Sequence, residues 1–341
     1  MDCSETVVTT RKSVALYPLP ERGLLAVEGS DRVRWLNGMV TNDVRNLAIN
    51  SERAGCHAMV LDRKGAIVAD VTIWAKEDSL LLETDQAILG DLENHFRKFI
   101  IADDVQLISK TAELKRWSLE GPKSFELLAA LLGEETTLTP WQGRDCSIAD
   151  RKVSLLGFGF SGENGVQFLL EATEEAPVMD ALRQAAEPLQ FIEGDEKARE
   201  VLRVEAGRPA LHTELMPKVF PQEARLEEAI STTKGCYIGQ EITARLASRG
   251  HVNRLLVGLK LGESASLPAN GTELFVDGKN VGKVTSSTHS PHVGAVALAM
   301  VRTEQTEPGQ ALQLGDGGSE VQVVALPFVV GGQARGADDN A

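Results

Sequence analysis

Residues 234–241 read Lys-Gly-Cys-Tyr-Ile-Gly-Gln-Glu, and this octapeptide decides more about the chain than any other stretch. It places one thiol, that of Cys236, between two glycines and two residues after Lys234. Good helix formers follow from Ile242, so the thiol is expected at the start of a helix. A neighbouring cation and a helix N-terminus both favour the thiolate, the reactive form of cysteine. From local chemistry alone, a packed thiol is the alternative, because free cysteine is usually buried.

Length, composition and charge bound the class of protein. The chain has 341 residues, which suggests two or three domains and a substantial core. Hydrophobic residues make up 43% and charged residues 25%, as in soluble globular proteins. The net charge of −14 argues against nucleic acid or an anionic membrane as the main partner, because both need clustered cations. An anionic ligand must therefore meet a local basic site.

Targeting and metal signals are absent from the sequence pattern. No stretch approaches the roughly 20 apolar residues that span a bilayer. The first residues, Met1 to Glu5, carry acids where a secretory or mitochondrial address carries bases, which predicts a cytoplasmic protein. The four cysteines, at positions 3, 56, 146 and 236, form no Cys-x-x-Cys pattern. We therefore expect no locally encoded zinc or iron–sulfur site.

The first 110 residues alternate short strands with helices. Helices are expected after Ser30-Asp31, which offers an N-cap, and over 87–101, where apolar residues recur at helical spacing. Asp62 to Gly65 form a good hairpin turn. This order is typical of an α+β unit and not of a doubly wound sheet. The expected strands are 23–29, 57–61, 67–74 and 79–83.

The rest of the chain divides into a second α+β portion and a β-rich end. Beyond Gly250 the pattern changes to short β runs punctuated by glycine, with a hairpin signal at Asp277-Gly278. Such spacing argues for a small antiparallel barrel or sandwich. The predicted organisation is an α+β module at 1–250 with subdomains at about 1–110 and 111–250, a C-terminal barrel at 251–330, and a disordered tail at 331–341.

Three further stretches extend the pattern around the octapeptide: Arg203-Val204-Glu205-Ala206-Gly207, Pro221-Gln222-Glu223-Ala224, and Thr41-Asn42-Asp43-Val44 near the start. Together they resemble the YgfZ-type folate-binding proteins. These are relatives of the glycine cleavage T-protein, an aminomethyltransferase, and act in the maturation or maintenance of iron–sulfur proteins. The resemblance covers nearly the whole chain. It implies ferredoxin-like α+β subdomains arranged with a C-terminal antiparallel β-barrel around a channel that holds tetrahydrofolate or a derivative.

The resemblance also implies functional residues. Cys236, with Lys234 beside it, is the expected functional thiol, which would engage a cluster, a partner or a one-carbon species. Glu205 is the leading candidate for the pterin edge, whose amino group and ring N–H one carboxylate can accept together. A salt-bridged helix residue is the alternative interpretation of Glu205. Arginines would meet the folate glutamate tail. The other folate-binding candidates are Asn42, Asp43, Tyr237, Gln240, Arg245, Arg249 and, as a further cation, Arg254.

One departure from the T-protein bears on the reaction. Where the T-protein hairpin has two adjacent aspartates, this chain reads Ala69-Asp70. Asp70 can still act as an acid or base, but the missing carboxylate argues against genuine glycine cleavage activity. The resemblance thus implies a tetrahydrofolate-binding accessory factor for assembly, maintenance or repair of iron–sulfur proteins, with iron–sulfur client or assembly proteins as partners. The alternative is a folate-dependent aminomethyltransferase that uses Asp70. A thiol enzyme is a weaker option, because no histidine motif marks a base.

Two other features predict no site. Gly157-Phe158-Gly159-Phe160-Ser161-Gly162 is only superficially like a dinucleotide fingerprint, because no strand–turn–helix unit with a later acidic residue supports it. The six histidines are scattered along the chain, so structural roles are expected for them.

Overall fold

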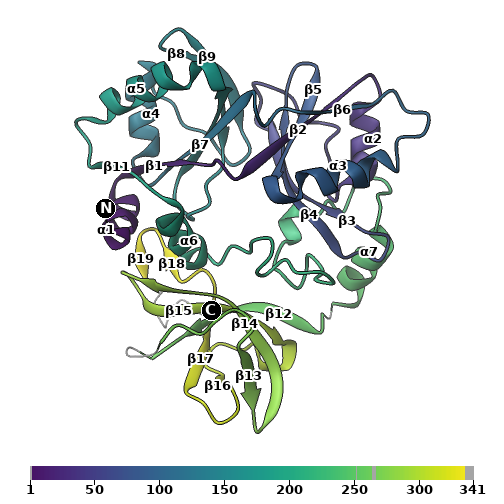
Figure 1. Ribbon diagram of the computed structural model, residues 1–341, viewed down its shortest axis with the longest axis vertical. Coiled ribbons are helices and arrows are strands. Elements are labelled where there is room, and N and C mark those ends of the chain that lie inside the picture. The colour runs from purple at the N-terminus through teal and green to yellow at the C-terminus, as the bar shows by residue number, and fades with distance from the viewer. Residues whose placement is uncertain (1, 251, 263–265, 335–341) are drawn as a thin grey trace.

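The first α+β subdomain is built on a five-stranded sheet of order β3-β4-β5-β2-β6. The computed structural model describes residues 2–250, 252–262 and 266–334. The first subdomain lies at the upper right in Figure 1. Its helices bury their apolar faces on the sheet, and the Trp35 ring meets Phe96 edge-on at 5.3 Å. Its elements are β2 (Arg22–Glu28), α2 (Arg32–Met39), β3 (Gly55–Leu61), β4 (Ile67–Ala75), β5 (Ser79–Asp85), η1 (Gln86–Ile88), α3 (Leu89–Arg97) and β6 (Gln106–Ser109).

The second subdomain is a six-stranded sheet of order β11-β1-β7-β10-β9-β8, at the upper left in Figure 1. Its core gathers the apolar faces of α4 and α5 against strands that include Phe168 and Leu155. Its elements are α1 (Cys3–Lys12), β1 (Val14–Pro18), β7 (Leu114–Glu120), α4 (Ser124–Leu132), β8 (Gly143–Ile148), β9 (Arg151–Gly157), β10 (Gly165–Glu171), η2 (Ala172–Glu174), α5 (Glu175–Ala186) and β11 (Phe191–Glu193).

The N-terminal segment lies in the second subdomain, which corrects the predicted subdomain of about 1–110. Strand β1 pairs antiparallel with β7 and parallel with β11, so residues before β2 complete the other sheet. The segment was missed because Val14 to Tyr17 are buried on both faces and show no period-two alternation. The chain therefore crosses between the subdomains twice, once on each side of β2–β6.

The C-terminal portion is a closed antiparallel barrel of order β12-β15-β14-β13-β16-β17, which confirms the predicted fold class. Asp277 and Gly278 both have positive φ, as a two-residue hairpin turn requires. Figure 1 shows the barrel below the two subdomains. Its elements are β12 (Arg254–Lys260), β13 (Glu273–Val276), β14 (Lys279–Ser290), β15 (Gly294–Arg302), η4 (Thr303–Gln305), β16 (Ala311–Leu314) and β17 (Glu320–Val324).

Connecting segments fill the space between the three bodies. These are α6 (Glu196–Glu205), η3 (Glu227–Ala229), α7 (Gln240–Arg249) and the hairpin β18 (Val329–Val330) to β19 (Gln333–Ala334). The predicted disordered tail is wrong for residues 331–334, because β19 pairs with β18; residues 335–341 lie outside the described part of the chain. The hairpin returns toward α6, where the Phe328 amide donates to the Glu205 carbonyl at 2.8 Å.

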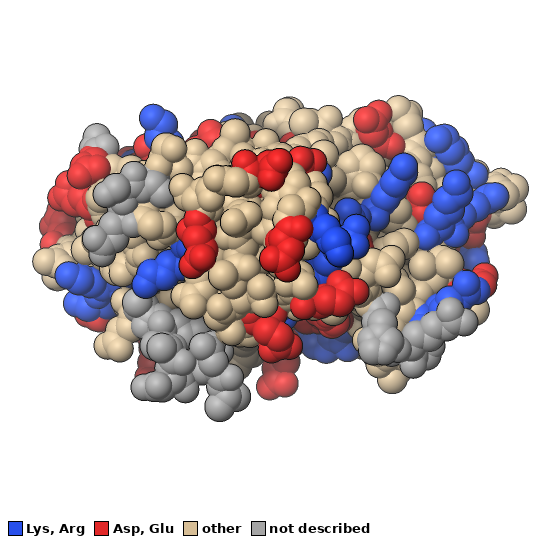
Figure 2. Space-filling view, turned by 90° about the horizontal axis from the view of Figure 1, so that it is seen from below, with Lys and Arg blue, Asp and Glu red and all other residues tan. Residues whose placement is uncertain are grey.

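The surface agrees with the acidic composition. On the face seen from below in Figure 2, separate acidic side chains lie among uncharged residues in the middle, and basic side chains lie mainly in the right half and at the left end. A continuous basic field of the kind that binds nucleic acid is not visible on this face. Within the described ranges, no helix is long and apolar enough to cross a membrane.

One buried ion pair fixes α6 between the second subdomain and the barrel. Arg11 of α1 donates from Nε and Nη2 to Oε2 of Glu205, at 3.0 and 2.8 Å. Its Nη1 donates to the carbonyl of Ser161 and to Glu163, at 2.8 and 2.9 Å. Oε1 of Glu205 accepts from Ser290 of the barrel at 2.5 Å. Every polar contact of this carboxylate is therefore internal.

Removing Arg11 should destabilise the whole chain. Arg11→Ala leaves the Glu205 carboxylate buried without its cation, which costs about 3–5 kcal/mol of unfolding free energy. Urea denaturation monitored by circular dichroism measures this. Arg34→Ala, which removes a mostly exposed arginine paired with Asp31 and Asp103, is the matched control and should leave the midpoint nearly unchanged. Equal midpoints for Arg11→Ala and the wild type would contradict this assignment.

Candidate functional site

A cavity of about 580 Å³ lies where the two α+β subdomains meet α6 and the segment that follows it. This volume is in the range of sites that hold drug-sized ligands. Its wall combines aromatic rings with both signs of charge. The lining residues are Leu19, Glu21, Arg22, His57, Asp70, Thr72, Glu83, Asp85, Phe158, Phe160, Gln167, Glu196, Arg199, Glu200, Arg203, 206–211, Arg225, Leu226 and Glu228.

Strand β4 places Asp70 on the cavity wall and Ala69 in the hydrophobic core. Side chains alternate along the strand, so Ala69 is fully buried in the first subdomain while Asp70 is half-buried and lines the cavity. Consequently, the missing carboxylate at position 69 removes nothing from the cavity. Because Ala69 faces the core, its lack of a carboxylate gives no structural reason against aminomethyl transfer in this cavity.

His57 is the direct partner of the Asp70 carboxylate. Its Nε2 is hydrogen-bonded to Oδ1 of Asp70, and Thr84 Oγ1 donates to the Asp70 backbone carbonyl at 2.8 Å. Burial alone would raise the pKa of Asp70, but His57 and then Arg22 outweigh it, so the pKa is lowered. Asp70 is thus an ionised acceptor facing the cavity.

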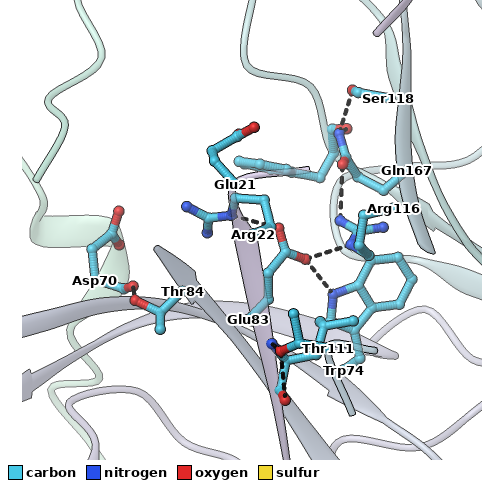
Figure 3. Close-up of polar contacts among 12 residues, drawn as sticks. Glu21, Arg22, Asp70, Trp74, Glu83, Thr84, Thr111, Arg116, Ser118 and Gln167 are labelled. Carbon is cyan, nitrogen blue, oxygen red and sulfur yellow. Dashed lines mark hydrogen bonds and ion pairs between the residues drawn. The ribbon is translucent and has the colours of Figure 1, made fainter. Parts of the chain in front are cut away.

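Glu83 of β5 joins the two sheets beneath the cavity (Figure 3). Its Oε1 accepts from Arg22 Nε at 2.8 Å, and its Oε2 accepts from Arg116 Nε at 2.7 Å and from Trp74 Nε1 at 3.3 Å. Although burial opposes ionisation, the two arginines lower the pKa of Glu83 to about 2. Figure 3 shows the Arg22 guanidinium on the side of Glu83 that faces Asp70, so this ion pair fixes a cation at the cavity wall.

Four planar groups stack in a row, and three of them, Arg208, Phe158 and His57, line the cavity. The Arg208 guanidinium lies 5.1 Å from the Phe158 ring centroid, and Phe158 stacks on Trp141 at 4.7 Å. Trp141 in turn stacks on His57 at 6.4 Å with 20° between the planes. Within the described part of the chain, no carboxylate lies within ion-pair distance of the half-buried Arg208 guanidinium. Arg208 is therefore a cation that an anionic ligand can neutralise.

The octapeptide lies on the C-terminal end of α2, away from the cavity lining. The Lys234 ammonium is buried and donates to the carbonyls of Asn37, Val40 and Asn42, at 2.6, 2.6 and 2.7 Å. Burial lowers the pKa of Lys234 to about 8, opposed by Asp43. The final carbonyls of a helix carry partial negative charge, so this ammonium stabilises the C-terminal end of α2. Lys234 has a structural contact that the sequence did not reveal.

Cys236 is the exposed cysteine of the four that the structure describes. The prediction that it lies at a helix start beside a cation is wrong, because α7 begins four residues later at Gln240 and the Lys234 ammonium points into the protein. Gly239 provides the positive φ at the N-cap and packs against the β3–β4 hairpin. The loop that precedes α7, held by Lys234 and Gly239, therefore presents the thiol to solvent.

Glu205 does not line the cavity in the described structure. Its side chain is fully buried, with Arg11 on one oxygen and Ser290 on the other. The predicted pterin contact is thus corrected to a structural ion pair, because both oxygens are occupied by internal donors. The neighbouring Arg203, one of the cavity-lining residues, is held by Glu200 and Glu214.

The other predicted folate ligands that the structure describes also lie outside the lining. Asn42 donates from Nδ2 to the His57 carbonyl at 2.8 Å, so it supports the wall from behind. Hydrogen bonds from Arg45 lower the pKa of Asp43 to about 2. Tyr237 is buried beneath Lys234, and its amide donates to Gln240. The remaining cations are Arg245, which pairs with Glu241, Arg254, which pairs with Glu223, and Arg249, whose side chain lies outside the described residues.

The residues that do line the cavity were mostly missed from the sequence. His57 and Arg22 lie inside ordinary strand patterns, and nothing local distinguishes them. Phe158 belongs to the glycine-rich stretch that resembled a dinucleotide loop, and Arg208 sits in a Gly-Arg-Pro break between elements. Because binding residues concentrate on loops, a cation and an aromatic ring in glycine-rich loops could have indicated Arg208 and Phe158 as cavity residues. In the described ranges, no three His, Cys, Asp or Glu side chains are placed to hold a metal.

Comparison with known proteins identifies the family to which this architecture belongs. The profile of the GCVT N-terminal domain matches residues 2–234, and that of the glycine cleavage T-protein C-terminal barrel domain matches residues 254–329. An aminomethyltransferase of Listeria monocytogenes serotype 4a (strain HCC23) is 27% identical over 93% of this chain and 87% of its own. That of Bacillus subtilis (strain 168) is 29% identical over 89% and 84%.

A solved structure shares the fold. The crystal structure of the glycine cleavage system aminomethyltransferase T from Bartonella henselae superposes with a TM-score of 0.84 at 22% identity, covering 98% of this chain and 91% of that one. The profile matches extend over both the α+β subdomains and the barrel. The chain therefore belongs to the glycine cleavage T-protein (GCVT) family.

Proposed function

We propose that this chain is a tetrahydrofolate-binding accessory factor for the assembly, maintenance or repair of iron–sulfur proteins, with the folate in the central cavity and Cys236 as its working thiol. The observation that carries the folate part is the cavity itself, about 580 Å³ with aromatic rings, an ionised carboxylate and a cation without an ion-pair partner among the described residues. The observation that favours the thiol is its exposure on a fixed loop.

The cavity residues fit a reduced folate. The Asp70 carboxylate is an acceptor for the N–H groups of a pterin or an amine, and Phe158 offers an aromatic face. Arg208 and Arg22 are cations that would meet the glutamate carboxylates. When bound, the folate supplies nitrogen atoms that accept a one-carbon unit, while these residues orient it and limit its contact with water.

Aminomethyl transfer remains a second candidate, because a specific observation favours it. Asp70 faces the cavity as an ionised carboxylate, and Ala69 faces the core, so the cavity wall has a carboxylate that could act as a base. The relatives compared above carry the name aminomethyltransferase. The octapeptide around Cys236 favours the accessory role. Iron–sulfur enzyme activity and glycine cleavage activity, measured in the same cells lacking this protein, separate the two: loss of only the former selects the first.

Folate should bind through Arg208 and not through Arg245. In calorimetry with tetrahydrofolate, Arg208→Ala should weaken binding by about 1.5–3 kcal/mol, roughly 10- to 100-fold in Kd, because a charged hydrogen bond is lost. Arg245→Ala, the same change on exposed α7, is the control and should bind like the wild type. If the intact protein shows no saturable binding, the folate assignment fails.

Ala69→Asp should destabilise the protein and should not create aminomethyl transfer. The new carboxylate would lie in the core of the first subdomain, where an unpaired charge costs several kcal/mol, so the thermal midpoint should fall. Ala244→Asp, at an exposed position of α7, is the matched control and should leave the midpoint nearly unchanged. A rise in transfer activity with an unchanged midpoint would contradict the assignment of position 69 to the core.

Cys236 should be the first cysteine to react with iodoacetamide near pH 7.5. Burial raises the pKa of Cys56 to about 12 and that of Cys146 to about 11, so both remain protonated and shielded, whereas Cys236 is exposed. Peptide mass spectrometry over time gives the order. Cys236→Ser should keep the thermal midpoint yet fail to restore iron–sulfur enzyme activity in deficient cells, with Cys146→Ser as the control that restores it. Full rescue by Cys236→Ser would remove the thiol from the proposal.

A further inference from the structure

We propose that His57 is a positioning residue for Asp70: its imidazole holds the carboxylate toward the cavity as an acceptor for an N–H group of the bound ligand. Where the ligand is named as a reduced folate, the inference rests on the proposed function. The His57–Asp70 pair itself does not depend on it. Both side chains line the cavity, and the contact between them joins neighbouring strands of the first subdomain.

The strand register brings the two side chains together. In the antiparallel pair of β3 and β4, His57 lies opposite Thr72 and Met59 lies opposite Asp70. His57 and Asp70 are therefore diagonal neighbours on one face of the sheet, a separation that long side chains can bridge. Because the ionised carboxylate can only accept, the Nε2 atom of His57 is the nitrogen that carries the proton in this hydrogen bond.

The imidazole is also fixed from the second subdomain. Its plane stacks on Trp141, whose amide donates to the Gly157 carbonyl at 2.7 Å and whose carbonyl accepts from the Ala54 amide at 2.9 Å. On the other side, the backbone carbonyl of His57 accepts from Asn42 at 2.8 Å. Ring and backbone are thus both held, so the direction in which Nε2 points is set by the packing of the two subdomains.

The surrounding charges predict what removal of His57 does. Burial raises the pKa of Asp70, His57 and Arg22 lower it, and Glu83 raises it. Without His57, burial and Glu83 are opposed mainly by Arg22, so the pKa of Asp70 should rise. The carboxylate would then be protonated as the pH falls through a higher value than in the wild type. The other charged groups on the cavity wall near the pair are Arg208 and Glu228.

A titration without ligand tests the pair directly. The ¹³C carboxyl resonance of Asp70, assigned with Asp70→Asn, should titrate below the range of free aspartate in the wild type and at clearly higher pH in His57→Ala. His57→Gln, whose amide N–H can still donate, should lie between them. His289→Ala, the same change at an exposed barrel histidine, is the control and should match the wild type. An Asp70 titration that is identical in all four proteins overturns the proposal.

Tetrahydrofolate binding across pH gives the second readout. In His57→Ala, affinity at pH 5 should be about tenfold weaker than at pH 7.5, because a lost charge-assisted hydrogen bond is worth roughly that factor, whereas the wild type should change little. His57→Gln should recover part of the affinity at pH 5, because its amide N–H still favours the ionised carboxylate. If the wild type binds no folate, the proposed function fails while the carboxyl titration still decides the role of His57. If all variants bind with one pH profile, His57 has no positioning role.

Discussion

The arrangement of the whole molecule depends on the buried ion pair between Arg11 and Glu205. These residues are 194 positions apart, and their contacts with Ser161 and Ser290 bring together α1, the loop after β9, α6 and the barrel. Glu205 occupies the last turn of α6, and the same helix turns Arg199 and Arg203 toward the cavity. A charge at this depth is tolerated only because every oxygen has a donor. The ion pair therefore fixes the position of α6, which contributes Arg199 and Arg203 to the cavity wall.

The cavity is a product of domain packing. Glu83 binds Arg22 from its own sheet and Arg116 from the other, so the two sheets meet through a fully paired carboxylate. With Glu83 paired, Asp70, Arg208 and the aromatic rings are among the groups that line the cavity. Ligand sites often form at such junctions, because two domains can bring together polar groups that no single sheet could place.

The octapeptide lies outside the cavity lining, and Asn42 connects the two through hydrogen bonds to Lys234 and to His57. Lys234 donates to the Asn42 carbonyl, and Asn42 donates from its amide to the His57 carbonyl. His57 then bonds Asp70. The loop that presents Cys236 and the wall that faces the ligand therefore share a continuous line of hydrogen bonds. In the proposed function, this places the thiol on the outer surface and the folate inside, with Asn42 between them.

The sequence by itself determined the α+β class, the hairpin at Asp277-Gly278 and the β-rich C-terminal part, because strand and helix periodicity and turn chemistry are local properties of a few residues. It also marked Asp70 and Cys236, the first through the resemblance to the T-protein hairpin and the second by its neighbours. Tertiary structure alone decided that β1 joins the second sheet, that Glu205 is buried against Arg11, and that His57, Arg22 and Arg208 face one cavity. These outcomes depend on contacts between residues distant in the chain, whose pairing no local pattern encodes.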